Sequence, residues 1–192
     1  SNKIRSNYFG LNFNSPIILL SGCVGFADEY TRVEGFSNRD VGGVCLKGTT
    51  LDERLGNNAQ RIYETTDGMI NAIGLQNPGA DYVIDNVLPS LNFNETNFIA
   101  NISGASVDEY VSVVKKFDNS NINALEINIS CPNVKEGGVH FGNDYEMTSR
   151  IVSECRKNTK KPLIIKLSPN QSNIGMSAQK CIDAGADGLS VI

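Results

Sequence analysis

The sequence contains no block of lysine or arginine, no C-x-x-C pair and no long hydrophobic run. Its 192 residues carry 17 basic and 21 acidic side chains, for a formal net charge of −4. The basic surface that nucleic-acid-binding proteins need is therefore missing, and we expect small molecules or proteins as partners, with no nucleic acid. No stretch approaches the ~18 apolar residues of a membrane helix, which predicts no membrane association.

Cysteine is present, but its pattern excludes two common uses. The chain has an odd number of widely spaced cysteines, at Cys23, Cys45, Cys131, Cys155 and Cys181. Neither a disulfide framework nor a zinc site is indicated, so we expect no metal. Residues 1–7 lack the apolar core of a signal peptide, and together these absences predict a cytoplasmic protein. Apart from Cys131, we expect the cysteines to pack as small buried hydrophobes.

Short apolar runs alternate with longer amphipathic segments along the chain. The runs predict six strands, at 16–22, 42–48, 97–103, 124–130, 161–168 and 188–192. The amphipathic segments predict helices at about 27–37, 79–92, 106–117, 143–158 and 173–184. Such alternation predicts a parallel sheet covered by helices, either an open doubly wound sheet or a (β/α)8 barrel. No G-x-G-x-x-G follows the first strand, which weakens the dinucleotide-binding alternative.

Three predicted helices carry signals for where they begin or end. Ser106 with Glu109 forms a capping box, and Asn143 with Glu146 offers the same arrangement with asparagine as the cap. Gly185 is placed to end the last helix in a left-handed conformation. The helix boundaries are therefore expected near these residues.

Polar side chains gather at the predicted strand ends. In the strand from Ala124, the apolar Leu125 and Ile127 alternate with Glu126 and Asn128, so one face is polar up to the carboxyl end. Three strand ends share a pattern of a nitrogen-bearing side chain, an apolar residue and a serine, at 101–103, 128–130 and 166–168, and Lys47 occupies the same place in the second strand. Polar groups converging from several strands favour the top face of a barrel.

Residues 49–77 form a connection far longer than the usual two to six residues, which indicates a functional segment. Two short runs joined around Asp67-Gly68 predict a hairpin within it. The segment ends in Asn71-Ala-Ile-Gly-Leu-Gln-Asn77, where two amides flank a glycine that lets the backbone approach a ligand. Such amides are normally part of ordinary turns, so the expected binding role of Asn71 and Asn77 rests mostly on the family resemblance described next.

At Asn71-Ala-Ile-Gly-Leu and Asn128-Ile-Ser-Cys-Pro-Asn-Val-Lys-Glu-Gly-Gly138 the sequence resembles the dihydroorotate dehydrogenases, specifically the class 1, NAD-linked catalytic subunit. Further matches fall in the family's order, at Ser21-Gly-Cys-Val-Gly-Phe26, Lys47-Gly-Thr-Thr, Asn101-Ile-Ser-Gly and Lys166-Leu-Ser-Pro. The resemblance implies an FMN-dependent (β/α)8 TIM barrel that oxidises dihydroorotate to orotate in pyrimidine synthesis. Membrane-linked class 2 relatives carry serine at the position of Cys131, so the cysteine favours the soluble class.

The resemblance also implies the roles of individual residues. Cys131 would be the general base that removes the C5 proton while FMN takes the hydride from C6. The residues matching FMN contacts are Ser21, Lys47, Gly48, Asn101, Asn128, Lys166 and Ile192. The residues matching substrate contacts are Lys47, Asn71, Ala72, Ile73, Gly74, Leu75, Asn128 and Asn133. The expected partner of a catalytic homodimer is an iron–sulfur flavoprotein that carries FAD and a 2Fe-2S cluster.

The pattern accounts for about six β/α units, whereas the family barrel has eight. We therefore expect residues 1–192 to be a single, incomplete barrel domain, truncated after the sixth strand. Such barrels bind phosphate with the loops after strands seven and eight, which predicts weak FMN binding and little turnover by this piece alone. Two alternatives stay open: another flavin barrel acting on pyrimidines, of the dihydropyrimidine dehydrogenase type, and an inactive half-barrel that serves as an assembly module.

Overall fold

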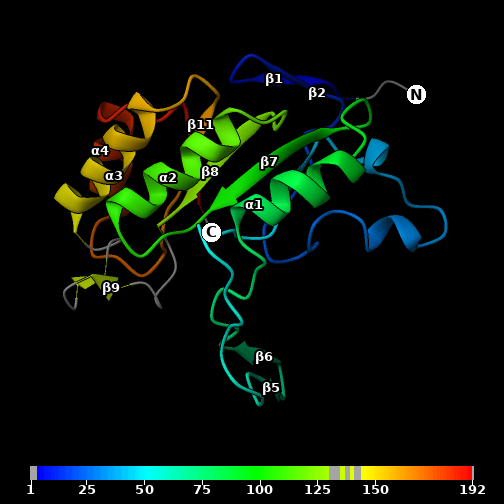
Figure 1. The fold of residues 1–192 in the computed structure, drawn as a ribbon, viewed down its shortest axis with the longest axis horizontal. Coiled ribbons are helices and arrows are strands. Elements are labelled where there is room, and N and C mark those ends of the chain that lie inside the picture. Colours follow the sequence, from blue (N-terminus) through cyan, green and yellow to red (C-terminus); the bar gives the residue numbers. More distant parts are fainter. Residues whose placement is uncertain (1–3, 130–134, 137–138, 141–143, 192) are drawn as a thin grey trace.

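The computed structural model describes residues 4–129, 135–136, 139–140 and 144–191. Its centre is a parallel sheet with the strand order β12-β11-β8-β7-β4-β3, so strands adjacent in sequence are adjacent in space (Figure 1). The strands are β3 (Ile18–Leu19), β4 (Gly43–Cys45), β7 (Asn97–Ile102), β8 (Ala124–Asn128), β11 (Leu163–Lys166) and β12 (Gly188–Ser190). The predicted six-strand parallel order is confirmed, although each strand is shorter than predicted.

The helices of the described chain pack on one side of this sheet (Figure 1). They are α1 (Ala80–Tyr82), which continues as η3 (Val83–Val87) and η4 (Leu88–Ser90), then α2 (Val107–Asp118), α3 (Tyr145–Lys157) and α4 (Ile174–Asp183). Their apolar faces share a core with alternate strand residues such as Phe98, Leu125, Ile127 and Ile165. A doubly wound sheet has helices on both faces, so the arrangement fits a partial (β/α) barrel, as predicted.

The opposite face of the sheet is the interior of the partial barrel. Its lower layer contains the buried Cys45, Ile99, Ala124 and Ile164, which pack with Leu11 and Ile18. A hairpin of β1 (Ser6–Tyr8) and β2 (Leu11–Phe13), which the sequence did not suggest, leads into this layer. Farther along the same strands the interior becomes polar, so this face has an apolar base and a polar upper part.

Two of the predicted helix boundaries are refined by the capping contacts. Ser106 caps α2 by accepting the Glu109 N–H at 3.2 Å, but the Glu109 carboxylate accepts the N–H of Ala105 rather than that of Ser106. The predicted cap of α3 at Asn143, which lies outside the described residues, is wrong, because Asp144 caps that helix and accepts two N–H groups of its first turn. Gly185 ends α4 with φ +104°, as predicted.

The predicted helix at 27–37 is wrong. The segment contains η1 (Tyr30–Arg32), a single 3-10 turn, and a second turn, η2 (Asn38–Asp40), follows it. Gly35 takes φ +86°, which interrupts helical geometry, and Ser37 begins the second turn with a capping box to Asp40. The stretch therefore holds one short exposed turn, and Ala27 and Phe36 near its ends are the residues that pack against the core.

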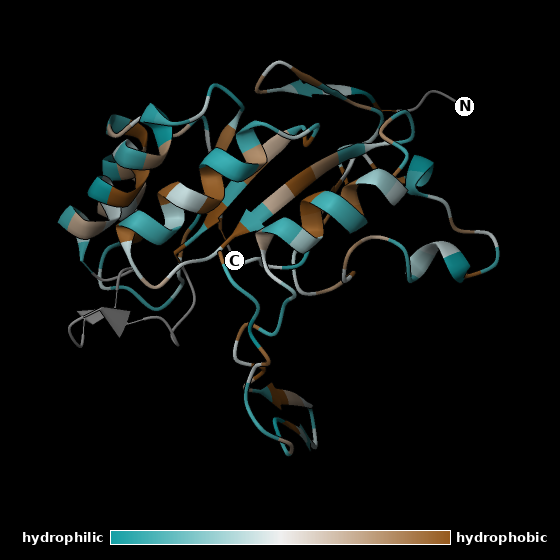
Figure 2. Ribbon diagram, in the orientation of Figure 1, coloured by the Kyte–Doolittle hydropathy of each residue, from teal (hydrophilic) through white to brown (hydrophobic). Residues whose placement is uncertain are grey.

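An antiparallel arm extends from the body at the carboxyl end of the sheet (Figure 1). It is the predicted hairpin, made of β5 (Ile62–Thr65) and β6 (Gly68–Asn71). The arm and its base expose large apolar and aromatic side chains at Leu55, Ile62, Tyr63, Met69 and Ile70. Brown, hydrophobic segments are visible on the arm in Figure 2. A further short pair, β9 (Lys135–Glu136) and β10 (Val139–His140), lies in sequence after β8.

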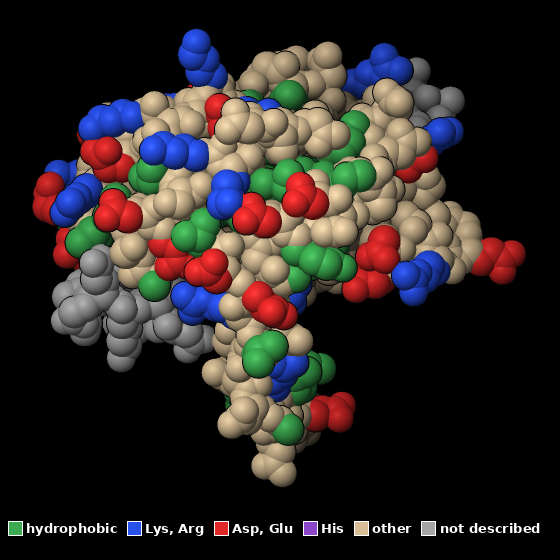
Figure 3. Space-filling view, in the orientation of Figure 1, with side chains coloured by type: hydrophobic (Ala, Val, Ile, Leu, Met, Phe, Trp, Pro, Cys, Tyr) green, Lys and Arg blue, Asp and Glu red, His purple; other side chains and the backbone are tan. Residues whose placement is uncertain are grey.

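Charged residues of both signs are interspersed over the helix layer (Figure 3). Several are paired, for example Lys116 with Asp81 at 2.6 Å and Arg156 with Asp187 at 2.8 Å. Within the described ranges, no helix combines the length and apolar character needed to cross a bilayer. The helix layer is therefore an ordinary solvated surface, and the features that suggest function lie on the other side of the sheet.

Candidate active site

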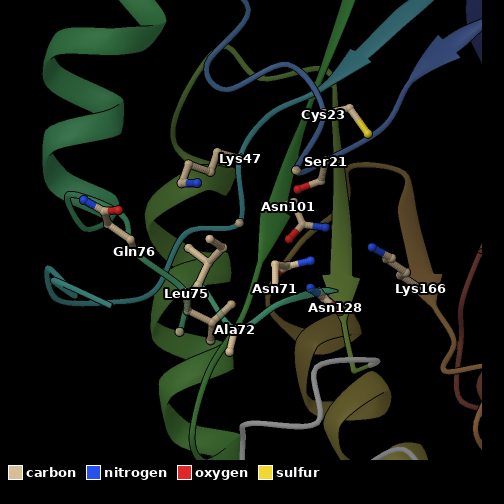
Figure 4. A pocket seen from close by; sticks show the side chains of 14 residues that line it. Ser21, Cys23, Lys47, Asn71, Ala72, Leu75, Gln76, Asn101, Asn128 and Lys166 are labelled. Atoms are coloured by element: carbon tan, nitrogen blue, oxygen red, sulfur yellow. The ribbon is translucent and has the colours of Figure 1, made fainter. Parts of the chain in front are cut away.

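A cavity of about 560 Å³ opens where the parallel strands end (Figure 4). Its walls come from the loops after β3 and β4, the ends of β7, β8 and β11, and the segment that follows β6. The lining residues are Ser21, Gly22, Cys23, Lys47, Gly48, Asn71, Ala72, Ile73, Gly74, Leu75, Gln76, Asn101, Asn128 and Lys166. The carboxyl ends of barrel strands are where such folds place their active sites.

With the exception of Asn77, every predicted site residue that the structure describes lies on this lining. Residues far apart in sequence, such as Ser21 and Lys166, are brought together because successive parallel strands end at the same edge of the sheet. Cys131, Asn133 and Ile192 lie outside the described residues. The individual roles of all these residues stay predictions.

Two lysines give the cavity its charge. Lys47 follows β4, Lys166 is the last residue of β11, and both are half-buried. They are the charged members of the described lining, and Figure 4 shows the Lys166 ammonium pointing into the space between the strands. Partial burial strengthens the attraction of a cation for an anionic ligand, so the cavity favours a negatively charged or electron-rich group.

The floor of the cavity contains an amide with one unused acceptor. Asn101 is fully buried, and its Nδ2 donates to Oε1 of Glu126 at 2.7 Å. Its Oδ1 has no hydrogen-bond partner in the described protein. A Cβ placed on Gly48 would lie 3.0 Å from that oxygen, so glycine keeps open the space in front of it. A buried acceptor left unpaired is costly, and a ligand N–H would satisfy it.

The segment from Asn71 to Gln76 is held in an unusual backbone conformation beside the cavity. Gly74 and Leu75 have φ values of +78° and +57°. A Cβ on Gly74 would lie 2.7 Å from the backbone nitrogen of Asn57, so this glycine is required by close packing as well as by its dihedral angle. Asn57 donates from its backbone to Ile73 O at 2.9 Å and from Nδ2 to Ala72 O at 2.7 Å, which fixes the wall.

The predicted binding role of Asn77 is wrong. Its side chain is buried and does not line the cavity. Its Oδ1 accepts the N–H groups of Thr50 and Gly79, and its Nδ2 donates to Leu75 O at 2.7 Å. These bonds join the two ends of the long connection and leave no amide group for a ligand, so Asn77 supports the wall from behind.

Three lining residues, Gly22, Cys23 and Gln76, were not predicted as site residues. The prediction that Cys23 packs in the core is wrong, because this cysteine is exposed at the cavity. Gln76 follows the matched Asn71–Leu75 stretch, and its Oε1 accepts a hydrogen bond from Arg61 of the arm. Adjacency to predicted site residues is the sequence signal that could have found all three.

The remaining described cysteines are buried, as predicted. Burial raises the pKa of Cys155 to about 12, and it does the same for Cys181. The pKa of Cys45 is also raised well above its ordinary value, first by burial and then by the neighbouring Glu126 carboxylate. All three are therefore neutral thiols near pH 7. Among the described side chains, no group of three or more His, Cys, Asp or Glu residues is placed to hold a metal ion.

Comparison with known proteins gives one family and consistent relatives. The family model described as "Dihydroorotate dehydrogenase" matches residues 3–192. Three relatives bear the name "Dihydroorotate dehydrogenase B (NAD(+)), catalytic subunit". The relative from Petrotoga mobilis is 49% identical over 98% of this chain and 62% of its own length. The relative from Oceanobacillus iheyensis is 48% identical over 95% of this chain and 60% of its own length. The relative from Malacoplasma penetrans is 42% identical over 100% of this chain and 62% of its own length. The chain thus spans about three fifths of the curated relatives it matches.

Proposed function

The chain belongs to the dihydroorotate dehydrogenase family, and we propose that the protein carrying this sequence oxidises dihydroorotate to orotate with FMN, in the NAD-linked form of the enzyme. One observation carries the proposal. The strand-end residues that resemble the family's site residues surround a single cavity that contains two lysines and a fully buried, unpaired amide oxygen. The reaction is a step in pyrimidine synthesis, and a cytoplasmic location remains part of the proposal.

The described residues fit a flavin. Lys47 and Lys166 offer positive charge to an electron-rich ring, the Asn101 Oδ1 offers an acceptor to a ring N–H, and Gly48 leaves the space that a flat ring needs. We propose that these residues, with Ser21 and Asn128, hold FMN. Bound FMN would accept the hydride from C6 of dihydroorotate.

The protein's own contribution is to bind the ring, orient it and move one proton. Asn71 and the segment that follows it would hold the carboxylate and amide edge of the substrate, because an amide can both donate and accept. Lys47 would neutralise the substrate's carboxylate charge. Cys131 would remove the C5 proton, a role that rests on the resemblance because this residue is outside the described ranges. A free thiol of pKa ~8.5 needs only modest tuning to act as a base near neutral pH.

The general base can be tested in the full-length protein carrying this sequence. Cys131→Ala should retain bound FMN, because the thiol is not among the predicted flavin contacts, but flavin reduction by dihydroorotate in a single turnover should slow by about 10²–10⁴-fold. Anaerobic stopped-flow absorbance measures the rate, and the flavin content of the purified variant measures FMN binding.

Cys181→Ala is the matched control, since this thiol is buried on α4 and lies outside the cavity lining. It should reduce its flavin at the parental rate. Undiminished flavin reduction in Cys131→Ala would remove Cys131 from the mechanism, and a failure of the parent to bind FMN would reject the proposed cofactor.

We further propose a catalytic homodimer that works with an iron–sulfur flavoprotein carrying FAD and a 2Fe-2S cluster. The relatives' name, "catalytic subunit", supports a separate partner, and the apolar side chains exposed on the β5–β6 arm support a protein contact outside the core. Light scattering of the catalytic subunit, alone and mixed with the partner, measures both associations. A monomeric catalytic subunit would contradict the homodimer.

A further inference from the structure

We propose that Glu126 is a positioning residue for the flavin: its buried carboxylate fixes the amide of Asn101 so that Oδ1, and not Nδ2, faces the cavity. The inference rests on the proposed FMN site and adds to it a residue that does not line the cavity. Glu126 would act through Asn101, without touching flavin or substrate.

Glu126 lies on the interior face of β8 with only 6% of its surface exposed. Three donors from three other strands converge on it. Oε1 accepts from Asn101 Nδ2 at 2.7 Å and from the Cys45 thiol at 3.2 Å, and Oε2 accepts from the Ser190 hydroxyl at 2.5 Å. The carboxylate therefore joins β4, β7 and β12 to β8 directly beneath the cavity.

The alignment of the strands explains why Asn101 is the amide that Glu126 holds. In the parallel pairing of β7 with β8, Asn101 is the residue in register with Glu126, and both side chains point to the barrel interior. One layer below, the corresponding interior positions hold the apolar Ile99 and Ala124. The interior thus changes from apolar to polar side chains at the layer of Glu126 and Asn101, and Asn101 lines the cavity.

An ionised carboxylate is chemically suited to this task because it can only accept hydrogen bonds. An amide opposite it must present its nitrogen, so its oxygen is left pointing the other way. A glutamine in place of Glu126 could donate or accept, and either orientation of Asn101 would then be satisfied. Burying a carboxylate is costly, and the three donors offset part of that cost. Purely structural packing would be achieved more cheaply by an apolar residue, as in the layer below.

The consequence appears on the cavity floor. Asn101 Oδ1 and the hydroxyl of Ser103 are both buried and without a partner in the described protein, and both lie near Gly48. The oxidised flavin ring carries one N–H donor between two carbonyl groups, so a fixed acceptor is the complement that this edge needs. If Asn101 were free to rotate, either its oxygen or its NH₂ group could face the flavin ring. The preference of this site for the ring N–H over the neighbouring carbonyl groups would then be lost.

The test uses the full-length protein, with FMN affinity, the flavin absorption spectrum and the flavin midpoint potential as readouts. Glu126→Gln, which is nearly isosteric, should raise the FMN dissociation constant by about tenfold, the loss expected when one ligand hydrogen bond is no longer oriented. It should also shift the absorption bands and move the midpoint potential to a more positive value, because a negative charge near the ring is removed. Glu126→Asp keeps the charge but withdraws it by one methylene, and it should weaken FMN binding without the same shift in potential.

A double-mutant cycle with Asn101→Ala identifies the route of the effect. If Glu126 acts through Asn101, Glu126→Gln should change FMN affinity by less than about twofold once Asn101 is alanine. Cys45→Ala is the matched control, because it removes another donor to the same carboxylate. It should lower the melting temperature and leave FMN affinity within about twofold of the parent.

The outcomes separate the inference from the function on which it rests. Parental FMN affinity and spectrum in both Glu126→Gln and Glu126→Asp, with FMN bound to the parent, would overturn the positioning role alone. Equal effects of Glu126→Gln in the presence and absence of the Asn101 amide would also overturn it. A parent that does not bind FMN would overturn the proposed function together with this inference. If Glu126→Gln does not fold, Glu126→Asp carries the test.

Discussion

Lys47 illustrates how a single side chain links the fold to the proposed chemistry. It follows the buried strand β4, so its backbone is fixed, and its N–H donates to Gly25 O at 2.8 Å. Its side chain is left to meet a ligand in the cavity. A charge-assisted contact of this kind contributes more than a neutral hydrogen bond because both the donor and the acceptor are ionised.

We predict that Lys47→Ala weakens orotate binding by about 10- to 100-fold, the range expected for losing one charged hydrogen bond. The orotate-induced change in flavin absorbance measures the dissociation constant. Lys160→Ala serves as the control, since this lysine is exposed and lies outside the cavity lining. Equal orotate affinity in Lys47→Ala and the parent would exclude Lys47 from the substrate site.

A second residue-scale prediction concerns alkaline stability. The pKa of Cys155 is raised to about 12 by burial, whereas the unfolded thiol titrates near pH 8.5. The unfolded state therefore loses its proton first, and stability falls as pH rises from about 8.5 towards 12, by up to ~1.4 kcal/mol per pH unit. Cys155→Ala should be less stable near neutral pH, because it leaves a cavity, but should show a shallower alkaline decline in the free energy of unfolding. Urea denaturation of both proteins at several pH values measures the free energy of unfolding. An equally steep alkaline decline in Cys155→Ala and in the parent would contradict the assignment.

The sequence located cavity-lining residues where the side chain's direction follows from the two-residue period of a strand. Asn128 and Lys166 could be placed because alternation along a strand determines which face a residue occupies. Asn77 and Cys23 could not, because they lie in connections, where hydrogen bonds such as that from Asn77 to Leu75 O decide the direction. The position of Glu126 on a polar face was readable, but its three donors come from other strands and only the folded chain brings them together.

At the scale of elements, Gly48 lies between β4 and the long connection. Its absent side chain leaves open the space in front of Asn101 Oδ1 and Ser103 Oγ, which a Cβ would approach to 3.0 and 3.7 Å. Gly48 does not have a positive φ, so its position does not require the left-handed conformation that favours glycine. We therefore propose that this glycine serves the close approach of a ligand rather than backbone freedom.

Gly48→Ala should accordingly reduce FMN affinity by about tenfold or more while changing the melting temperature of the apoprotein little, because the added methyl group occupies ligand space. Gly68→Ala in the arm is the control, since the nearest atom to its Cβ would be Thr65 Oγ1 at 3.9 Å. Fluorescence titration with FMN measures the affinity. A fall in melting temperature with unchanged FMN affinity would show that Gly48 serves packing instead.

Elements with local stop and start signals were predictable, and those shaped by packing were not. The helices after Ser106 and Asn173 have side-chain caps and strong apolar faces, and the structure has both. The stretch around Gly35 has an apolar pattern without a matching cap, and positive φ at that glycine divides it. Helix propensity is a weak prior when a glycine interrupts the pattern.

At the scale of the whole molecule, the order of the strands determines which residues can form a site. Six parallel strands in sequential order bring the ends of β4, β7, β8 and β11 to one edge, and the arm returns the Asn71–Gln76 segment to the same edge. Repeated β/α alternation made this arrangement predictable from sequence. The chain covers about three fifths of its relatives' length.

The most direct test of the account is an anaerobic titration of the FMN-loaded full-length protein with dihydroorotate, read by flavin absorbance, with dihydrouracil in a parallel titration. The account predicts that one equivalent of dihydroorotate bleaches the flavin and yields one equivalent of orotate, while dihydrouracil has no effect, because the lysine and amide lining is proposed to recognise the carboxylate. Bleaching by dihydrouracil but not by dihydroorotate, or by neither compound, would contradict the proposed function.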